Sequence, residues 1–466
     1  MKLGLVPAHR GFFSGALAVE MRDKTIAALA AAGAEVVVPD PSRTRLGCVE
    51  SREEAALAGR LFRAAEVDGI VVGAMNFGDE QAAAAALRTA DLPAPVLLFG
   101  CPENGPLRPG AQRRDAFCGL LSIAAALRQV GVEYSLPRQP ILDPASAEFA
   151  AEAAQFLGVC RTVQSLRRAR YGQIGARPDA FWTCRFDEAA LQRLGPTTVT
   201  LDLSELLLAV REEGIREEAG ALAASMDRSA DLSQVAAESR SRLAALEAAL
   251  RRFVREQQLD AVAIQCWTSL QRNLGVCSCF AMSRLADDGI PAACEADVLG
   301  ALSMHALQLA GTRPAALADW NNLHHADQDL VNLWHCGVFP ASWAKRRPIV
   351  GPHEILSGPA AILPADQTQG VINLELADGP VTLCRVAHDA ENGWQVVLAE
   401  GVIEERPEST TFGSYGWCRI PRLRELYREV LLRHFPHHVA AAPGRHADVL
   451  SEAFGRYLGF KVHRHA

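Results

Sequence analysis

Short hydrophobic runs alternate with longer amphipathic stretches along the first third of the chain. The runs are almost continuously apolar, which is typical of parallel strands covered by helices on both faces. They predict strands at Leu3–Pro7, Glu35–Val38, Asp68–Gly73 and Pro95–Gly100. The amphipathic stretches predict helices at 17–32, 52–66, 80–89, 116–131 and 145–160. Because strands that alternate with helices form right-handed crossovers, we expect a parallel α/β sheet here.

A second α/β unit is predicted from Arg170 onward. Its expected strands are Thr197–Asp202, Ala261–Cys266, Pro291–Glu295 and Ala315–Asp319. Residues 217–256 have helical spacing with a break between Asp227 and Ser233, and a further helix is expected at 298–310. The renewed alternation of apolar runs and helices again indicates a parallel sheet.

The pattern changes near Pro340. Residues 346–410 are rich in Gly, Pro and β-forming residues, with turn signals at Asp378–Gly379 and Asn392–Gly393, and they predict antiparallel β-structure. A helix is expected at 421–434. The fold class predicted from these patterns is α/β, with two parallel-sheet α/β domains followed by a β-rich C-terminal domain. The expected domain boundaries are 1–165, 166–342 and 343–466.

Composition agrees with this picture and excludes several classes of protein. A chain of 466 residues has room for about three domains. The 54 acidic residues exceed the 47 basic ones, which disfavours binding to nucleic acid. The longest apolar runs fall short of the roughly 18 residues that a membrane span needs, so we expect no membrane association. The N-terminus lacks signal-peptide features, and 12 cysteines suit a reducing compartment, so a cytoplasmic location is predicted.

Two carboxylates are the first candidates for chemistry. Glu295 ends one predicted strand and Asp319 ends the next one along the chain. Parallel α/β sheets bind ligands beyond the carboxyl ends of their strands. A single carboxylate in this position is more simply a helix cap or turn residue, but two at neighbouring strand ends favour a functional site.

Histidine and cysteine supply competing metal ligands. His437-His438 follows the last predicted helix, and other candidates are His324-His325 and His335-Cys336. Two carboxylates with one imidazole form a hard site that suits Mn²⁺ or Mg²⁺. A rival soft site would use four cysteines, for which structural packing is the favoured interpretation because no C-x-x-C pair occurs: Cys266, Cys277, Cys279 and Cys294.

Nucleotide-binding motifs do not occur in the sequence. It contains no G-x-x-x-x-G-K-[ST] segment, and the first strand is followed by Pro-Ala-His-Arg-Gly in place of a G-x-G-x-x-G turn. We therefore expect no nucleotide cofactor. The polar turn from Asn76 to Glu80 is either a ligand loop or an acidic helix start.

The candidate residues lie in segments that resemble the L-fucose isomerase / L-arabinose isomerase family, nearer the fucose branch. The resemblance covers nearly the whole chain and rests on the order and spacing of its segments. These are Cys294–Asp297, Ala318–Asn322, Trp334–Gly337 and Pro436–His438, with Arg114–Gly119 and Ile174–Pro178 as further matches.

The resemblance implies a metal-dependent aldose–ketose isomerase. Such an enzyme acts on an open-chain sugar through an enediol, with a divalent cation, usually Mn²⁺ and alternatively Mg²⁺ or another metal, to stabilise the enediolate. The implied metal ligands are Glu295, Asp319 and His438, and the two carboxylates also match the acid/base pair. Trp320 and Asn321 would contact the sugar, with Trp267 and Trp417 as further aromatic candidates.

The resemblance also implies a homo-trimer or homo-hexamer whose active sites are completed by a neighbouring subunit. Arg10 and Asn76 would then bind substrate across an interface. The chain is shorter than typical fucose isomerases, so the resemblance does not identify which sugar is the substrate. Arg10, Arg177 and Arg185 either recognise an anionic sugar or are ordinary surface arginines. A non-catalytic sugar-binding module, and a lyase or decarboxylase that uses the same enediolate, are the alternative functions.

Overall fold

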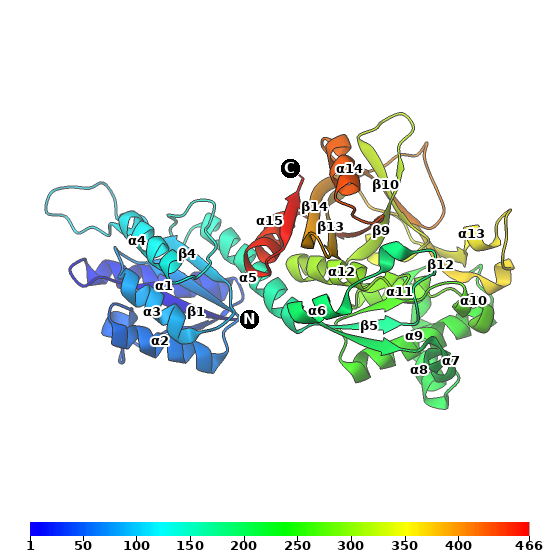
Figure 1. The fold of residues 1–466 in the computed structure, drawn as a ribbon, viewed down its shortest axis with the longest axis horizontal. Helices are drawn as coiled ribbons and strands as arrows, with labels where there is room; N and C mark the ends of the chain where they lie inside the picture. Colours follow the sequence, from blue (N-terminus) through cyan, green and yellow to red (C-terminus); the bar gives the residue numbers. More distant parts are fainter. Residues whose placement is uncertain (466) are drawn as a thin grey trace. The chain divides into compact units, whose positions relative to one another are not determined.

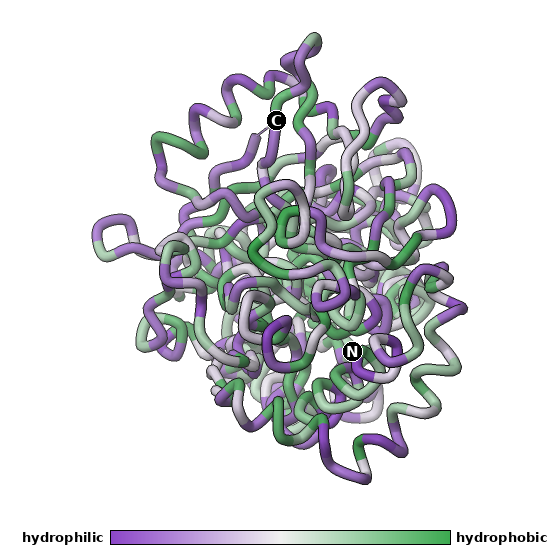
Figure 2. The backbone as a smooth tube through the Cα atoms, turned by 90° about the vertical axis from the view of Figure 1, so that its right-hand side faces the viewer, coloured by the Kyte–Doolittle hydropathy of each residue, from purple (hydrophilic) through white to green (hydrophobic). Residues whose placement is uncertain are grey.

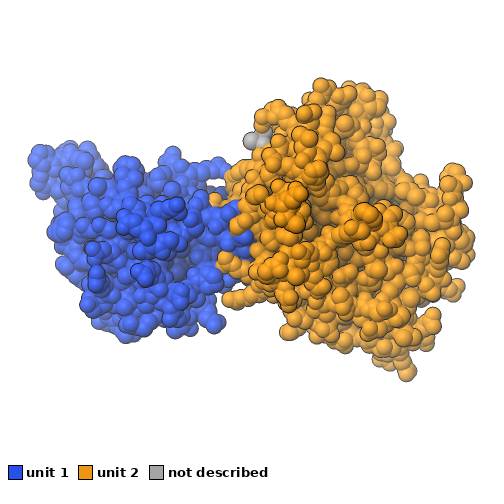
Figure 3. All heavy atoms as spheres, viewed as in Figure 1, with its two compact units in different colours: residues 1–164, 455–458 blue, residues 165–454, 459–466 orange. Residues whose placement is uncertain are grey.

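The computed structural model describes residues 1–465. Contacts among these residues divide the chain into two compact units (Figure 3). Unit 1 comprises Met1–Gln164 with Gly455–Leu458, and unit 2 comprises Ser165–Phe454 with the residues from Gly459 onward. The three-domain boundaries expected from the sequence stay a prediction.

Unit 1 is a parallel α/β layer structure. Its strands are β1 (Lys2–Ala8), β2 (Glu35–Val37), β3 (Gly69–Ala74) and β4 (Val96–Gly100), paired in the order β2-β1-β3-β4 (Figure 1). Its helices are α1 (Gly15–Ala31), α2 (Arg52–Ala65), α3 (Glu80–Ala90), α4 (Ala116–Gln129) and α5 (Ala147–Arg168), the last of which runs into unit 2. Two separate apolar clusters contain the side chains from the two faces of the sheet. The predicted parallel sheet is confirmed.

Unit 2 begins with a second parallel sheet. Its strands are β5 (Arg170–Ile174), β6 (Thr197–Leu201), β7 (Ala261–Ile264) and β8 (Ala292–Cys294), in the order β6-β5-β7-β8. The helices that follow them are α6 (Glu188–Leu194), α7 (Leu203–Ala209), α8 (Glu213–Ser229), α9 (Ala237–Gln257), α10 (Ser269–Leu274), α11 (Cys279–Asp287) and α12 (Val298–Gly311). The expected helix break between Asp227 and Ser233 is confirmed, because α8 ends at Ser229.

The rest of unit 2 is a large, mainly antiparallel sheet. Its strands are β9 (Ala316–Leu323), β10 (Leu330–His335), β11 (Ile349–Pro352), β12 (Gln369–Glu375), β13 (Gly379–Asp389), β14 (Gly393–Glu404), β15 (Ser414–Arg419), β16 (His438–Pro443) and β17 (Lys461–Arg464). Within the described residues the order β15-β10-β9-β16-β13-β14 closes on itself, because β14 also pairs with β15. A closed antiparallel barrel leaves no free edge among these strands. The short helix α13 (Glu354–Ser357), together with α14 (Leu423–Leu432) and α15 (Ala447–Ser451), completes the unit.

One predicted strand belongs to a different sheet. Ala315–Asp319 was expected to extend the second parallel sheet, and this expectation is wrong, because β9 pairs antiparallel with β10 and β16 in the barrel. A short apolar run has the same appearance whether it is buried in a parallel sheet or in a barrel wall. Glu295 and Asp319 therefore do not end neighbouring parallel strands, although the fold class of two α/β sheets followed by β-rich structure is confirmed.

Helices and core follow from the same amphipathic pattern. Helices at the edges of Figure 2 contain both hydrophilic and hydrophobic residues along their length, as expected when one face packs against a sheet and the other faces solvent. Helices α11 and α12 are buried on all sides over most of their length; α12, buried from Val298 to Leu307, packs against β13 and β16 of the barrel and β7 of the parallel sheet. It therefore joins the two sheets of unit 2. No helix in residues 1–465 has the length and apolar content to cross a membrane.

Candidate metal centre

Three predicted ligands come together from three different elements of unit 2. Glu295 follows β8 directly, Asp319 lies in β9, and His438 opens β16. His438 and Asp319 are directly opposite each other in the antiparallel β9–β16 pair, so their side chains share one face. His438 Nε2 lies 3.1 Å from Glu295 Oε2 and 3.7 Å from Asp319 Oδ1. The structure thus brings together Glu295 and His438, which are 143 positions apart in the sequence.

The facing atoms of these side chains are buried and unpaired. Glu295 Oε2, Asp319 Oδ1 and His438 Nε2 are each shielded from solvent and have no hydrogen-bond partner within the described chain. Leaving a buried polar atom unpaired costs about 1–3 kcal/mol, and more for a charged group. A divalent cation would satisfy two carboxylate oxygens and an imidazole nitrogen together, so this donor set fits a hard metal ion.

The turn that carries Glu295 is strained. Glu295 and Ala296 have positive φ angles of 62° and 53°, a left-handed conformation that costs about 1–2 kcal/mol for each L-residue. Ala296 N–H donates to Ile264 O at 3.1 Å and Asp297 N–H donates to Cys294 O at 3.1 Å, which stabilises the turn. Strain of this kind persists where the surroundings enforce it, often at functional sites.

Asp297 orients the histidine from the other side of its ring. His438 Nδ1 lies 2.7 Å from Asp297 Oδ2, and Arg385 donates to both oxygens of Asp297, at 2.6 and 3.2 Å. Asp297 also caps α12 by accepting the N–H of Gly300. A carboxylate on Nδ1 places the proton there and leaves the Nε2 lone pair free for a metal. The side chains of Arg385 and Asp297 are both almost fully buried.

The electrostatics of the site follow from burial and these contacts. Burial alone would raise the pKa of Asp297, but Arg385 and His438 outweigh it and hold that pKa below its usual range. Burial by itself lowers the pKa of His438, whereas its contacts with Asp297 and Cys184 and the facing Glu295 carboxylate raise it well above the usual value. Burial raises the pKa of Asp319. The pocket therefore favours a positive charge at its centre.

Two further groups surround the three ligands. His437 Nε2 is 3.7 Å from Asp319 Oδ1, and Cys184 Sγ is 3.9 Å from His438 Nδ1. Potential ligand atoms of Cys184, Glu295 and His438 lie within 4.8 Å of one another, and so do those of Asp319, His437 and His438. His438 is common to both groups and fully buried, whereas the His437 side chain is 42% exposed. This difference supports His438 over His437 as the ligand.

The competing histidines have different surroundings. The His335 ring centroid is 5.8 Å from that of His438, and His335 Nε2 is buried without a hydrogen-bond partner. Burial lowers the pKa of His335, but Cys336 and Asp319 raise it to a net value of about 9. His324, in contrast, accepts two backbone N–H groups in its own loop and packs edge-on against Trp417. His335 is therefore a second candidate ligand, and His324 has a structural role.

Aromatic side chains form one wall of the site. Trp267 donates its indole N–H to Glu295 Oε1 at 3.2 Å, which leaves Oε2 for another partner. The Phe181 ring meets both Trp267 and His437 edge-on, with centroid distances of 5.7 Å in each case. Trp417 lies against His324 and donates to Ser409 O. Among the tryptophans proposed to contact sugar, Trp267 is thus the one in direct contact with a candidate ligand.

Trp320 and Asn321 line a neighbouring cavity. Trp320 follows Asp319 in β9, and successive side chains of a strand point to opposite faces. A mostly apolar cavity of about 310 Å³ is lined by Trp320, Asn321 and residues of α14, with His437 at its border. Because His437 also contacts Asp319, this cavity adjoins the ligands. The predicted sugar contacts of Trp320 and Asn321 stay predictions.

Arg10 and Asn76 lie in unit 1. Asn76 is fully buried, and its side-chain oxygen accepts the backbone N–H groups of Arg10 and Gly78. The Arg10 guanidinium pairs with Glu80 and lies 3.5 Å from Asp79. The two residues lie in separate loops, after β1 and after β3, which this hydrogen bond joins, and their proposed contact with substrate across an interface stays a prediction.

Sequence reasoning missed Asp297 and Arg385. Asp297 follows Glu295 closely and precedes a predicted helix, so an N-cap was the only signal available for it. Arg385 lies in β13, and its sequence surroundings do not distinguish it from a surface arginine. Its contact with Asp297 depends on the packing of α12 against the barrel.

Two domains of known sugar isomerases match this chain. Residues 4–167 match the fucose/sulfoquinovose isomerase N-terminal domain, and residues 333–465 match the L-fucose isomerase C-terminal domain. The second match includes His438, whereas Glu295 and Asp319 lie between the two matched segments. Both ends of the chain thus match domains of sugar isomerases, in the order expected for that class.

Three curated relatives carry the same name. Sulfoquinovose isomerase of Alkalicoccus urumqiensis is 26% identical over 403 residues, which is 85% of each chain. Sulfoquinovose isomerases of Priestia aryabhattai and of Clostridium sp. (strain MSTE9) are 26% and 27% identical over about half of each chain. The chain belongs to the fucose/sulfoquinovose isomerase family, and it is a sugar isomerase.

Proposed function

We propose that the protein is a metal-dependent aldose–ketose isomerase that converts an open-chain sugar through an enediol. The ligands of its divalent cation would be Glu295, Asp319 and His438, with Mn²⁺ as the first candidate and Mg²⁺ as an alternative. The observation that supports this most is the convergence of three buried, unpaired ligand atoms from three elements. Membership of a sugar isomerase family supports the reaction class.

Glu295 and Asp319 would carry out the two proton transfers of the reaction. When bound, a divalent cation would stabilise the negative charge that develops on the substrate oxygens. Each carboxylate has two oxygens, so Glu295 or Asp319 can hold the cation with one and remove the C2 proton with the other. The second carboxylate would return a proton to C1. Asp297 and Arg385 hold His438 in the tautomer that leaves Nε2 free.

We propose a sulfonated hexose, sulfoquinovose, as the substrate. All of the relatives above are named for that sugar. Arg185 is an exposed cation that forms no ion pair within residues 1–465, and it stacks on Trp182 at 4.0 Å. It follows Cys184, which contacts His438, and its guanidinium would bind a charged end of the substrate. Arg177 instead donates to carbonyls of its own turn.

A homo-oligomer with shared sites is part of the proposal. Arg10 and Asn76 would reach the substrate from a neighbouring subunit. Mixing two inactive variants, Glu295→Gln and Arg10→Ala, tests this arrangement. Shared sites predict that mixed oligomers regain part of the wild-type activity, because some interfaces combine two intact halves. No regain in mixtures shown by mass measurement to contain both variants would contradict the shared site.

The test of the function is turnover by the purified chain. Chelator-treated protein should convert sulfoquinovose to its ketose only after Mn²⁺ is restored, and in heavy water the C2 proton should exchange for deuterium. Loss of activity in Glu295→Gln, with full activity in the exposed control Glu391→Gln, would assign the reaction to this site. Full metal-free turnover, or exchange without any ketose product, would contradict the isomerase proposal.

The Arg185→Ala variant tests the identity of the substrate independently of the type of reaction. Hydrogen bonds to a charged group contribute about 1.5–3 kcal/mol, so KM for sulfoquinovose should rise about 10–100-fold. Turnover of a neutral sugar such as L-fucose, if the enzyme accepts it, should be unchanged. An equal effect on both sugars would contradict the assignment of Arg185 to the sulfonate.

A further inference from the structure

A cluster of buried thiols lies beside the carboxylate site in unit 2. Five free cysteines, all buried, come close to one another there: Cys266, Cys277, Cys279, Cys294 and Cys336. Sequence reasoning favoured a purely structural role for such thiols. Their arrangement in space indicates a more specific chemistry.

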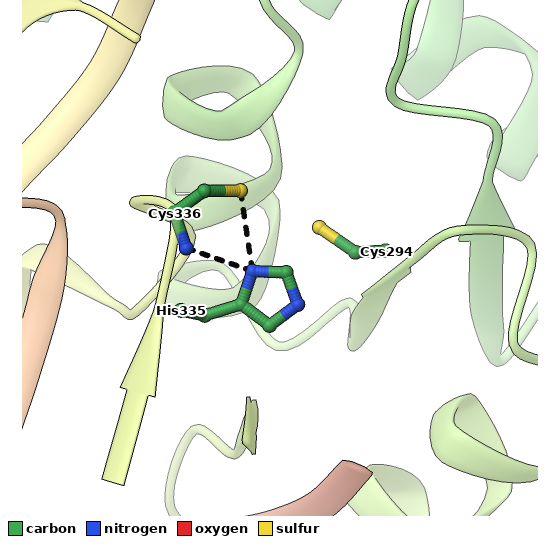
Figure 4. A group of neighbouring side chains, drawn as sticks. All are labelled: Cys294, His335 and Cys336. Carbon is green, nitrogen blue, oxygen red and sulfur yellow. Dashed lines mark hydrogen bonds between the residues drawn. The ribbon is translucent and has the colours of Figure 1, made fainter. Parts of the chain in front are cut away.

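Cys336 is at the centre of the cluster. Its Sγ lies 3.9 Å from Cys279 Sγ and 3.2 Å from His335 Nδ1, and it also has the Cys294 thiol as a hydrogen-bond partner. The potential ligand atoms of Cys294, His335 and Cys336 all lie within 4.8 Å of one another. Figure 4 shows the two thiols and the imidazole facing one another. Cys294 ends β8, His335 ends β10 and Cys336 follows it. Cys279 is the first residue of α11.

Three of these side chains are spaced closely enough to contact one metal ion together: Cys294, His335 and Cys336. Zinc binds sulfur at about 2.3 Å and nitrogen at about 2.0–2.1 Å, so tetrahedral angles place two sulfurs about 3.8 Å apart and sulfur and nitrogen about 3.5 Å apart. The Cys279–Cys336 sulfur–sulfur distance is 3.9 Å, and Cys336 Sγ lies 3.2 Å from His335 Nδ1, which also accepts the Cys336 backbone N–H at 2.9 Å. A disulfide would need a sulfur–sulfur distance of about 2.0 Å. The ligand atoms of Cys294, His335 and Cys336 are therefore close enough to share one ion, and Cys279 lies next to Cys336.

The donors select the kind of ion. Thiolates favour soft or borderline ions such as Zn²⁺ over Mn²⁺ and Mg²⁺, which prefer oxygen. We propose that Cys294, Cys336 and His335 bind one metal ion of the Zn²⁺ class, separate from the carboxylate site, and that Cys279 moves from its place beside Cys336 to become the fourth ligand. The three thiols release their protons to solvent as the ion binds, and the four protein ligands leave no open position.

Such an ion would have a structural role. Cys294 immediately precedes the left-handed turn at Glu295 and Ala296, and His335 lies beside His438. Joining β8, β10 and α11 through one ion would hold that turn in place. All four side chains are at most 7% exposed, so the ion would enter while the chain folds.

The test uses the whole chain produced in medium supplemented with Zn²⁺ or Co²⁺. We expect about one firmly held zinc per chain, and in the cobalt form a near-ultraviolet absorption band from thiolate-to-Co²⁺ charge transfer. Cys294→Ser and Cys336→Ser should lose the zinc and the band. Cys384→Ser, which changes an equally buried cysteine in β13, should keep both. Glu295→Gln should also keep both, which distinguishes this site from the carboxylate site.

A second measurement applies if the cysteine variants do not fold. Titrating the native wild-type protein with a mercurial reagent should release zinc in step with the thiols that react. Wild-type protein with no zinc and no thiolate–cobalt band would overturn the proposal. So would zinc that is lost in Glu295→Gln, or a disulfide between Cys279 and Cys336 in place of an ion.

Discussion

The carboxylate site and the cysteine cluster meet at a single turn, because Cys294 ends β8 and Glu295 follows it. The first site presents oxygen and imidazole donors, Glu295, Asp319 and His438, whereas the second presents sulfur. The left-handed turn at Glu295 redirects the chain between the two. Adjacent residues such as Cys294 and Glu295 can therefore serve different sites when a strand ends and the backbone turns between them. The type of donor atom, more than its position, sets which ion each site prefers.

The largest expected effect is on catalysis. Glu295→Gln removes a metal ligand and one member of the acid/base pair, so kcat/KM should fall about 10⁴-fold. The zinc content of the cysteine cluster should stay constant. A parallel loss of zinc would show that the two sites are one, and Glu391→Gln controls for the same chemical change on an exposed turn.

Removing Arg385 should lower stability strongly. Arg385→Met leaves the buried Asp297 carboxylate without its cation, which typically costs about 3–5 kcal/mol of unfolding free energy. Denaturant unfolding measures the loss. Arg424→Met, which changes an arginine on α14 whose contact is solvent-exposed, should cost much less. An equal loss in the two variants would contradict the role of the Arg385–Asp297 pair.

Asp297→Asn should weaken metal binding and, because it leaves the buried Arg385 without its anion, should also lower the free energy of unfolding. An amide can still accept a hydrogen bond from His438 Nδ1 but carries no charge, and changes to such supporting residues typically cost 10–100-fold in metal affinity, roughly 1.4–2.7 kcal/mol. Titration of chelator-treated protein with Mn²⁺ measures the shift. Activity at saturating Mn²⁺ should recover most of its value. If affinity is unchanged, Asp297 does not orient His438.

The smallest expected effect concerns a histidine outside both sites. Burial lowers the pKa of His305 to about 4, and its ring lies against Tyr171. Since the unfolded imidazole titrates near pH 6.5, the stability due to neutral His305 is complete above that pH and is lost as the pH falls toward 4. The slope is about 1.4 kcal/mol per pH unit for one proton.

His305→Gln tests this slope. The variant should unfold with a shallower loss of stability between about pH 6 and pH 4.5, because one fewer proton is taken up on unfolding. Unfolding free energies at several pH values provide the measurement. An unchanged slope would mean that His305 does not titrate in this range. The contrast with His438, whose pKa is raised by Asp297, shows that partners outweigh burial in the carboxylate site.

Much of the fold could be predicted from periodicity alone. The alternation of apolar runs and helices predicts both parallel sheets, and the turn signal at Asn392–Gly393 predicts the hairpin of β13 and β14. The assignment of Ala315–Asp319 failed because strand partners are set by long-range packing, which a short apolar run does not encode. Asp319 stays a predicted ligand, but its strand lies in the barrel and not in the second parallel sheet.

The candidate site could be predicted only in part. Glu295, Asp319 and His438 were selected from strand ends and family resemblance, and the structure brings their ligand atoms together. Asp297 and Arg385 could not be selected, because their importance depends on a contact between β13 and the start of α12. The cysteine cluster could not be predicted because its spacing along the chain matches no zinc motif, although Cys279 and Cys336 meet in space.

Anomalous X-ray scattering from crystals grown with both manganese and zinc tests the two-site account most directly. Data collected at the absorption edge of each metal locate each ion separately. The account predicts a manganese peak within bonding distance of Glu295, Asp319 and His438, and a zinc peak among Cys279, Cys294, Cys336 and His335. Manganese bound anywhere else, or manganese and zinc sharing one position, would contradict it.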